Sequence, residues 1–316
     1  MKYNLINFCE FDKNAVKSYC AIHNETEDKN LGDITKVNIE SLPKCNMITH
    51  GSPCQDFSVA GLQAGADEGT NTRSSLIWNS VKIIQQCQPK FVIWENVKNV
   101  LSKRHIHNFE KYLSVMEDLG YANYYKVLNA KDYGIPQNRE RIFCISIKKD
   151  IDCGFEFPNV QSSENLTFYD YLEKIVDDRF FLTDNDLLKV KGFGANYSFG
   201  GYLSDKKIYN TITKSYGKIT GNSMKFIRNG KISYLTPLET FRLMGFEDND
   251  YENCLRAVDN KIKEVYARAG NSIVVNIVVE IYKQLQIYYP NDFKDNISLI
   301  SLFSGIGAFE KAFQRV

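Results

Sequence analysis

A chain of 316 residues can bury a sizeable core, and this length favours one large domain plus a smaller one. Hydrophobic residues make up 43% and charged residues 24% of the sequence, which excludes disordered, collagen-like and supercharged proteins. The formal net charge of +1 shows no overall basic excess, so any contact with a polyanion must depend on a local surface.

The sequence predicts a protein without a membrane span, a disulfide or a metal. No apolar run approaches the roughly 18 residues that suggest a membrane span, and residues 1–4 lack the features of a signal peptide, so we expect a cytoplasmic protein. The eight cysteines include no Cys-x-x-Cys pair, which favours reduced thiols. His105 and His107 are the only close histidine pair, and that spacing alone is weak evidence, so we expect no metal.

The first half of the chain alternates short apolar runs with helical patterns, which is typical of a parallel sheet covered by helices. We expect strands at residues 3–8, 45–49, 91–94, 124–128 and 142–147. Helices are expected at residues 12–23, 75–87 and 108–119, the last of them ended by Gly120. These elements predict a doubly wound, mostly parallel α/β sheet.

The pattern changes after Lys149, where short strand-like pieces alternate with glycine and asparagine. We therefore expect a smaller, irregular β-rich domain. Between residues 185 and 235 there are nine basic residues and two acidic ones, which fits either a DNA-contacting face or an ordinary solvated surface. Helical structure returns at Thr236-Pro237-Leu238-Glu239, a capping box, and at residues 273–287.

The last 21 residues contain another buried strand, at 296–303, followed by a glycine turn and a helix that begins near Ala308. A strand, a glycine turn and a helix open a nucleotide-binding sheet, because glycines let a ligand approach the backbone at a helix amino terminus. Taken alone, this turn is better interpreted as a plain connection. Glu10, however, follows the strand at 3–8, where an acidic residue can bind ribose hydroxyls. The two ends of the chain together look like one interrupted β-α-β unit.

Three segments place reactive side chains at the ends of predicted strands, two of them at carboxyl ends, where ligands gather in α/β sheets. Cys54 lies in the polar loop after the strand at 45–49, although a single cysteine is more often a small core residue. Glu95 follows the next strand and is either a usable acid or a solvated strand end. Arg139 and Arg141 lie where the chain enters a third strand. They either bind a phosphate or a carbonyl oxygen or are ordinary charges at a strand edge.

Together these segments resemble one family, the C5-cytosine DNA methyltransferases of bacterial or phage restriction-modification systems. The matching segments span nearly the whole chain and are Phe303-Ser304-Gly305-Ile306-Gly307, Glu10, Gly32-Asp33-Ile34, Gly51-Ser52-Pro53-Cys54-Gln55, Glu95-Asn96-Val97, Gln137-Asn138-Arg139-Glu140-Arg141, Leu235-Thr236-Pro237-Leu238-Glu239 and Ala269-Gly270-Asn271-Ser272. Several independent short motifs at suitable spacings make this resemblance highly specific.

The resemblance implies a Rossmann-like methyltransferase fold, with a catalytic and cofactor-binding domain at residues 1–149 and 260–316 and a target-recognition domain and return segment at 150–259. It implies that Cys54 attacks a flipped cytosine, with Glu95, Arg141 and Arg139 around the base. It implies that S-adenosyl-L-methionine, and no metal, is bound by Phe303, Ser304, Gly305, Ile306, Gly307, Glu10, Phe11, Asp33, Ile34, Pro53, Leu76, Asn271 and Ser272. The implied DNA contacts are Gln55, Ser58, Thr211, Thr213 and Lys214.

The order of the segments departs from the family pattern, in which the glycine-turn strand comes first. Here it follows Gly270-Asn271-Ser272. A circular permutation explains this order, because proteins tolerate a new opening in an exposed loop when the natural ends are close. The alternative is a truncated or split enzyme that needs a partner chain. The expected partners are double-stranded DNA and a restriction endonuclease, with the enzyme itself a monomer.

Three other functions compete with this interpretation. A methyltransferase that acts on RNA cytosine carries a similar Pro-Cys loop, although the long basic segment favours a duplex DNA reader. A catalytically silent DNA-binding regulator has no need of Cys54, Glu95 and Arg141. A nicotinamide oxidoreductase is suggested only by the glycine turn and leaves the Pro-Cys loop unexplained.

Overall fold

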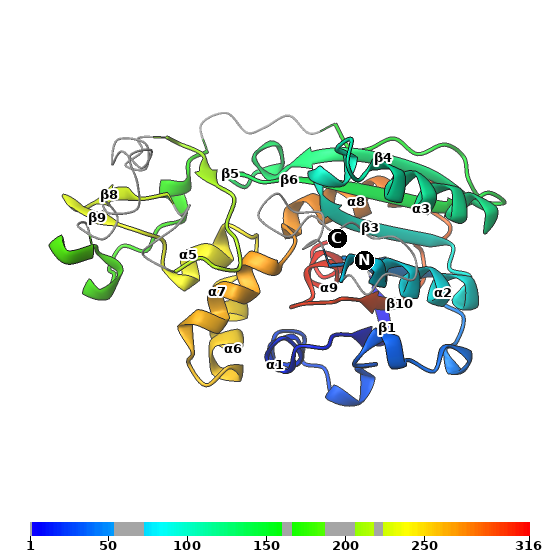
Figure 1. Cartoon of the computed structure of the whole chain (residues 1–316), viewed down its shortest axis with the longest axis horizontal. Helices are drawn as coiled ribbons and strands as arrows, with labels where there is room; N and C mark the ends of the chain where they lie inside the picture. The colour runs from blue at the N-terminus through cyan, green and yellow to red at the C-terminus, as the bar shows by residue number, and fades with distance from the viewer. Residues whose placement is uncertain (1, 54–72, 160–165, 187–205, 218–223) are drawn as a thin grey trace. The chain divides into compact units, whose positions relative to one another are not determined.

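The computed structural model describes residues 2–53, 73–159, 166–186, 206–217 and 224–316 (Figure 1). Cys54, Gln55 and Ser58 lie outside the described residues. The chain divides into two compact units, of which the first comprises Met1–Leu128, Glu140–Asn159 and Ile277–Val316. The second comprises Asn129–Arg139 and Val160–Asn276.

The first unit contains a six-stranded sheet in the order β1-β10-β2-β3-β6-β4. Its strands are β1 (Tyr3–Cys9), β2 (Met47–His50), β3 (Phe91–Val97), β4 (Tyr121–Asn129), β6 (Glu140–Lys148) and β10 (Ile297–Leu302). β1, β10, β2 and β3 run parallel to one another, whereas β6 is antiparallel to β3. The last strand in the sequence therefore lies inside the sheet, between the first two (Figure 1).

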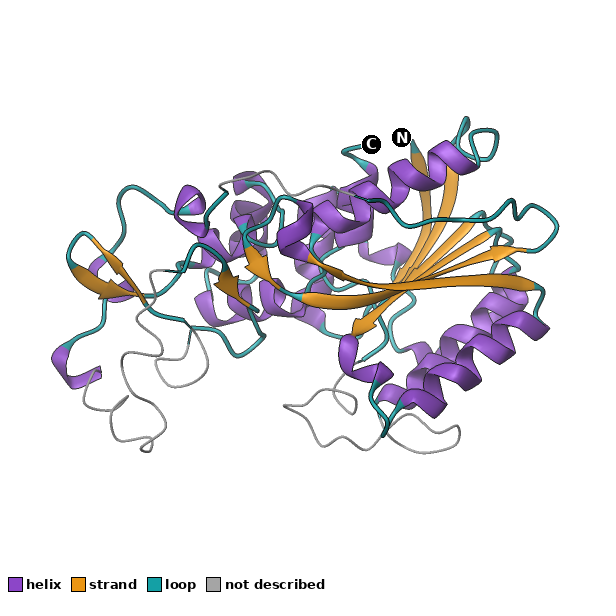
Figure 2. Cartoon of the chain, turned by 90° about the horizontal axis from the view of Figure 1, so that it is seen from above, coloured by secondary structure: helices purple, strands orange, loops and turns teal. Residues whose placement is uncertain are grey.

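Helices cover both faces of this sheet (Figure 2). They are α1 (Lys13–His23), α2 (Ile77–Cys87), α3 (Ile106–Asp118), α8 (Val275–Tyr288) and the short α9 (Ala308–Phe313). Side chains alternate between the faces along β3, as strand geometry requires. Val92 and Trp94 join the apolar cluster with α2 and α3, while the Phe91 ring packs on Tyr289, 5.2 Å between centroids. The structure therefore confirms the predicted α/β sheet with helices on both sides.

The ends of several predicted elements shift for local reasons. Glu95 belongs to β3, which the sequence pattern ended at residue 94, because the antiparallel pairing with β6 continues to Val97 opposite Arg141. Asp12 precedes α1 and caps it, since its carboxylate accepts hydrogen bonds from the backbone N–H groups of Asn14 and Ala15. Among the described helices, none is long and apolar enough to span a membrane.

The second unit has its own core. Its strands are β5 (Gln137–Asn138), β7 (Tyr209–Asn210), β8 (Phe226–Arg228) and β9 (Lys231–Ser233), and its helices are α5 (Pro237–Arg242), α6 (Asp248–Ala257) and α7 (Ile262–Asn271). β5 pairs with β7 in parallel and β8 pairs with β9 antiparallel. The apolar core includes Phe168, Tyr209 and Phe226, all fully buried.

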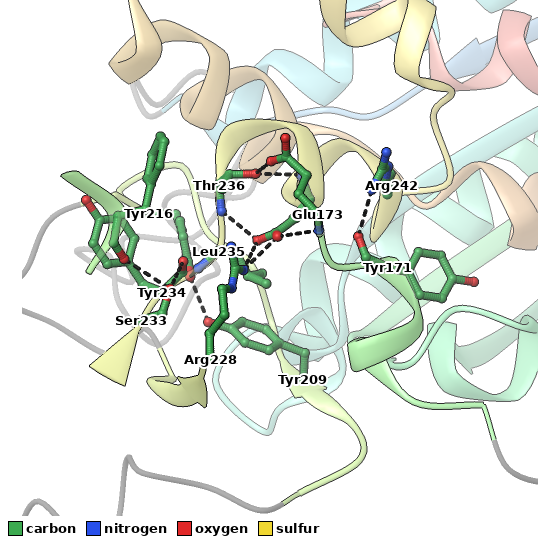
Figure 3. A network of polar contacts seen from close by, with 12 residues as sticks. Tyr171, Glu173, Tyr209, Tyr216, Arg228, Ser233, Tyr234, Leu235, Thr236 and Arg242 are labelled. Carbon is green, nitrogen blue, oxygen red and sulfur yellow. Dashed lines mark hydrogen bonds and ion pairs between the residues drawn. The ribbon is translucent and has the colours of Figure 1, made fainter. Parts of the chain in front are cut away.

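A buried ion pair organises the polar part of this core (Figure 3). The Glu239 carboxylate accepts hydrogen bonds at 2.6 and 2.7 Å from Nη2 of Arg228. It also accepts bonds at 2.8 Å from the backbone N–H groups of Thr236 and Glu173. The hydroxyl group of Thr236 in turn accepts a hydrogen bond from the N–H of Glu239, so the predicted capping box at the start of α5 is confirmed.

The second unit differs from the predicted β-rich region. Its described strands are only two or three residues long, and three helices accompany them, so helix exceeds strand in the described part. Residues 129–139 and 260–276 belong to this unit, although the sequence pattern placed both in the catalytic domain. The reason is packing: α7 lies against α5 and α6, and the Tyr266 hydroxyl donates to the carbonyl of Leu235 at 2.7 Å.

Candidate active site

The loop that leads to Cys54 is anchored by side chains of β3. The hydroxyl of Ser52 accepts a hydrogen bond from the indole Nε1 of Trp94 at 3.0 Å, and its carbonyl accepts one from the amide of Asn96 at 3.0 Å. On the other side, the hydroxyl of Ser74 donates to the carbonyl of Pro53 at 2.8 Å. The two residues that precede Cys54 are therefore each held by side-chain hydrogen bonds. The sequence analysis did not assign these roles to Ser52, Ser74, Trp94 and Asn96.

Glu95 lies between the two β3 residues that hold Ser52, and it forms an ion pair with Arg141. The Nε of Arg141 is 3.1 Å from Oε1 of Glu95, and the two side chains are 16% and 11% exposed. The register of β3 and β6 explains the contact. Glu95 pairs with Phe143, whereas Arg141 pairs with Val97, two residues farther along β3, so the two side chains are diagonal neighbours. The structure thus brings together two of the predicted catalytic residues, a carboxylate and a guanidinium with little solvent access.

Arg139 lies elsewhere, although it is only two residues from Arg141. It precedes β6 and belongs to the second unit, where its guanidinium donates to the carbonyl oxygens of Ile212 at 2.6 Å, Gly270 at 3.2 Å and Ser272 at 2.6 Å. Its guanidinium thus binds backbone carbonyl groups of the second unit. Its assignment as a catalytic residue stays a prediction.

The glycine turn after β10 meets Glu10 from the other end of the chain. The N–H of Gly305 donates to Oε2 of Glu10 at 2.9 Å, while Oε1 accepts from the N–H of Asp12 at 2.8 Å. Phe303 and Gly305 both have positive φ, 54° and 58°, and the first is an uncommon conformation for a bulky residue. Among the described residues other than its chain neighbours, no atom lies within 4 Å of where a Cβ on Gly305 would be, so the turn presents open backbone beside a carboxylate.

Gly307 is required for a different reason. Its φ is +75°, and a Cβ there would lie 2.1 Å from Nε2 of His23 and 2.9 Å from the Tyr19 ring. The same Nε2 atom lies 3.0 Å from the carbonyl oxygen of Ile306, and the Tyr19 hydroxyl donates to the buried carboxylate of Glu310 at 3.0 Å. Side chains of α1 therefore pack against the glycine turn and hold it in place.

Gly307→Ala and Gly305→Ala are expected to act differently. Gly307→Ala should lower the melting temperature strongly, because of the clash with His23, and His23→Ala should restore part of the loss. Gly305→Ala should cost only about 1–2 kcal/mol of backbone strain and yet remove cofactor affinity. Thermal unfolding and titration with S-adenosylhomocysteine measure the two effects. Equal stability losses in both variants would contradict the packing argument.

Apolar candidates for the cofactor lie in one cluster of the first unit. Ile34 is buried there, and Leu76 and Phe303 pack against the same cluster. Phe11, next to Glu10, is 77% exposed, which leaves its ring free to cover a ligand. Asp33 caps the 3-10 turn at Ile34–Lys36, and hydrogen bonds from the hydroxyl and N–H of Thr35 lower the pKa of its carboxyl.

Five further predicted residues lie in the second unit: Asn271, Ser272, Thr211, Thr213 and Lys214. Asn271 is the last residue of α7, and Ser272 is the C-cap. The Thr211 hydroxyl donates to the carbonyl of Asn138 at 2.6 Å, whereas Thr213 and Lys214 are exposed. Cofactor and DNA contacts of these residues stay predictions.

His50, the last residue of β2, is a further buried polar group close to Cys54 in sequence. It is fully buried, and its Nε2 lies 3.3 Å from the hydroxyl of Tyr112. Burial lowers the pKa of His50 to about 3, so the imidazole is neutral at physiological pH. Among the described residues, no three His, Cys, Asp or Glu side chains gather as metal ligands, and the absence of a metal stays a prediction.

Comparison with known proteins fits these features. A family model for "C-5 cytosine-specific DNA methylase" matches residues 1–287. The type II methyltransferase M2.ScrFI of Lactococcus lactis subsp. cremoris is 38% identical over 265 residues, 82% of this chain and 71% of that protein. M.HhaI of Haemophilus parahaemolyticus is 31% identical over 284 residues, 85% and 83% of the two chains. The Dnmt2 methyltransferase of S. pombe has a TM-score of 0.68 at 19% identity and covers 92% of both chains.

The mostly parallel sheet, with its glycine turn facing an acidic residue, is typical of nucleotide-binding α/β proteins. More specifically, the chain belongs to the C-5 cytosine-specific DNA methylase family. It is a DNA (cytosine-5-)-methyltransferase of the type II restriction-modification kind, in a family that uses S-adenosylmethionine. The oxidoreductase and silent-regulator interpretations are therefore wrong.

Proposed function

We propose that this methyltransferase works through Cys54 as nucleophile, with Glu95 and Arg141 holding the target cytosine. The observation that carries the proposal is the Glu95–Arg141 pair, 3.1 Å apart near the end of β3, where the flanking residues Trp94 and Asn96 bind Ser52, two residues before Cys54. A carboxylate and a guanidinium there suit a base that must be held by both its ring nitrogen and its carbonyl oxygen.

The proposed chemistry begins with a cytosine flipped out of the duplex, which costs a few kcal/mol. Carbon 5 of cytosine is a poor nucleophile, so the Cys54 thiolate adds to carbon 6 and pushes electron density to carbon 5. Ring nitrogen 3 takes up a proton as the thiolate adds; Glu95 hydrogen-bonds this protonated nitrogen and the amino group, and Arg141 donates to the carbonyl oxygen. After methyl transfer a base, which water can supply, removes the carbon 5 proton and Cys54 is expelled.

The residues of the first unit fit S-adenosylmethionine, which supplies the methyl group from its sulfonium. The open backbone at Gly305 leaves space for a ligand, and the Glu10 carboxylate beside it suits ribose hydroxyls. Ile34, Leu76 and Phe303 provide an apolar wall, and the exposed Phe11 ring offers a face for the adenine. Asp33, Ser304, Ile306, Gly307, Pro53, Asn271 and Ser272 complete the proposed set.

The proposed DNA contacts come from two segments. Gln55 and Ser58 follow Cys54 in the sequence and would close over the duplex. Thr211, Thr213 and Lys214 would read or hold the DNA, and the exposure of the last two supports this. A restriction endonuclease that cuts the same unmethylated site is the proposed functional partner of a monomeric enzyme that acts on cytoplasmic DNA.

The direct test incubates the protein with labelled S-adenosylmethionine and mixed-sequence duplex DNA, followed by conversion sequencing. We expect methylation of cytosine in one short sequence and none in transfer RNA under the same conditions. A duplex left unmethylated at every cytosine would contradict the proposal. Preferred methylation of transfer RNA would show that RNA, and not DNA, is the substrate.

We further propose that the order of segments reflects a circular permutation. β10 and the glycine turn lie outside the matched residues 1–287, yet β10 is inserted in parallel between β1 and β2. The rings of Tyr3 and Phe313 stack with 5.0 Å between centroids, so the first strand and the last helix already adjoin.

A rearranged chain tests the permutation. Joining Val316 to Met1 through a short Gly/Ser linker and opening the chain at the exposed residues 294–296 should keep methylation within about tenfold of wild type. The matched control opens the same joined chain between Leu299 and Ile300, which are fully buried in β10, and should not fold. A rearranged chain that is folded but binds no S-adenosylhomocysteine would count against the proposal.

A further inference from the structure

A buried guanidinium in the second unit joins two backbone segments that are far apart in sequence. Arg139 is 2% exposed, and Nη1 donates to the carbonyl oxygen of Ile212 at 2.6 Å. Nη2 donates to the carbonyl oxygens of Gly270 at 3.2 Å and Ser272 at 2.6 Å. One planar group with several fixed donors therefore links residues 211–214 to the end of α7.

Gln137 binds the other backbone polar group of Ile212. Its Oε1 accepts from the N–H of Ile212 at 3.0 Å, while its Nε2 donates to the carbonyl of Leu243 at 2.8 Å. Both polar groups of the Ile212 backbone are thus bound by side chains of one short segment, which also pairs as β5 with β7. Thr211 adds a hydroxyl bond to the carbonyl of Asn138 at 2.6 Å.

Gly270 lets the two segments approach closely. A Cβ at this position would lie 2.2 Å from the carbonyl carbon of Thr213 and 2.3 Å from the backbone nitrogen of Lys214. These are backbone atoms and cannot move away as the tip of a side chain can. The closeness of α7 to residues 213–214 is thus an independent sign that the two segments are packed as one piece.

We propose that Arg139 is a positioning residue that couples cofactor binding to DNA binding, by locking residues 211–214 to residues 270–272. The proposal rests on the proposed function, which assigns Thr211, Thr213 and Lys214 to DNA and Asn271 and Ser272 to the cofactor. A ligand that orders one segment orders the other through the shared guanidinium, so each ligand raises the affinity for the other. By thermodynamic linkage the two effects must be equal.

The test measures binding of the duplex site identified by conversion sequencing, with and without S-adenosylhomocysteine. In the wild-type protein we expect S-adenosylhomocysteine to tighten DNA binding by about 5- to 150-fold. DNA should tighten the binding of S-adenosylhomocysteine by the same factor. Arg139→Met should reduce both factors to below about threefold. Arg139→Lys, which keeps the charge but loses the fork of donors, should fall between them.

Gly270→Ala provides a second route to the same result. It leaves Arg139 in place and suits a helix, but its methyl group forces α7 away from the Thr213–Lys214 peptide. Gly270→Ala should also uncouple the binding of the two ligands, and it tests the proposal even if Arg139→Met fails to fold. Arg242→Met is the matched control, because Arg242 in the same unit contacts Asp248 and the carbonyl of Tyr171 instead of either segment.

The outcomes separate this inference from the proposed function. A wild-type protein that methylates DNA but shows no coupling, or variants at Arg139 and Gly270 that keep the full coupling factor, would overturn the inference alone. Coupling lost equally in Arg242→Met would also overturn it, because general loosening would then be the cause. A wild-type protein that methylates no duplex would instead overturn the proposed function.

Discussion

Cys54→Ala is expected to lower the rate of methyl transfer by on the order of 10⁴-fold or more, because nothing else activates carbon 5 of the cytosine. Binding of DNA and S-adenosylhomocysteine should persist, since neither depends on the thiol. Single-turnover transfer of a labelled methyl group to the duplex measures the effect. A second readout uses a duplex with fluorine at carbon 5 of cytosine, which blocks the final proton loss. The wild-type protein should be trapped as a covalent complex that survives denaturation.

Cys144 provides the matched control for the nucleophile. It is fully buried in β6, and burial raises the pKa of its thiol to about 12, so it is not a thiolate at neutral pH. Cys144→Ala should leave the rate per folded molecule unchanged and should still form the covalent complex. Rapid methylation by Cys54→Ala, or a covalent complex formed by that variant, would disprove the assigned role.

Glu95→Gln is expected to lower kcat by about 10²–10⁴-fold, because it removes the carboxyl group that holds the attacked base. It should also destabilise the protein by about 3–5 kcal/mol, since it leaves the largely buried guanidinium of Arg141 without its partner. Chemical denaturation measures the change in the free energy of unfolding. Single-turnover rates at saturating DNA measure the change in catalysis.

A double variant separates these two effects. Glu95→Gln combined with Arg141→Met removes both charges, so its stability should recover toward that of the wild type, whereas its rate should stay low. Recovery of the rate together with the stability would show that the pair is structural. The two residues would then have no direct role in holding cytosine.

Much of the fold was predictable because the apolar runs of the first half are short, regular and separated by helical patterns. The position of Glu95 was predictable as well, but its partner was not. Pairing with Arg141 depends on the antiparallel register of β3 and β6, which no local pattern encodes. The anchoring of Ser52 by Trp94 and Asn96 likewise joins residues more than 40 positions apart, through contacts that exist only in the folded sheet.

Arg139 shows where motif reasoning stops. Two arginines at alternating positions look equivalent in the sequence, yet Arg141 lies in β6 and Arg139 just before it, where the backbone turns toward Asn129. The second unit was also poorly predicted. Its strands are only two or three residues long, which is too short for an alternating pattern to develop.

The place of β10 between β1 and β2 has a consequence for the growing polypeptide. All the other strands of the sheet leave the ribosome before β10, so the edges of β1 and β2 that pair with β10 stay without this partner until then. The sheet can therefore be completed only after residues 297–302 emerge, and the unpaired strand edges favour aggregation of the nascent chain until then. An interrupted translation product lacks both the strand and the glycine turn, and with them a part of the proposed cofactor site.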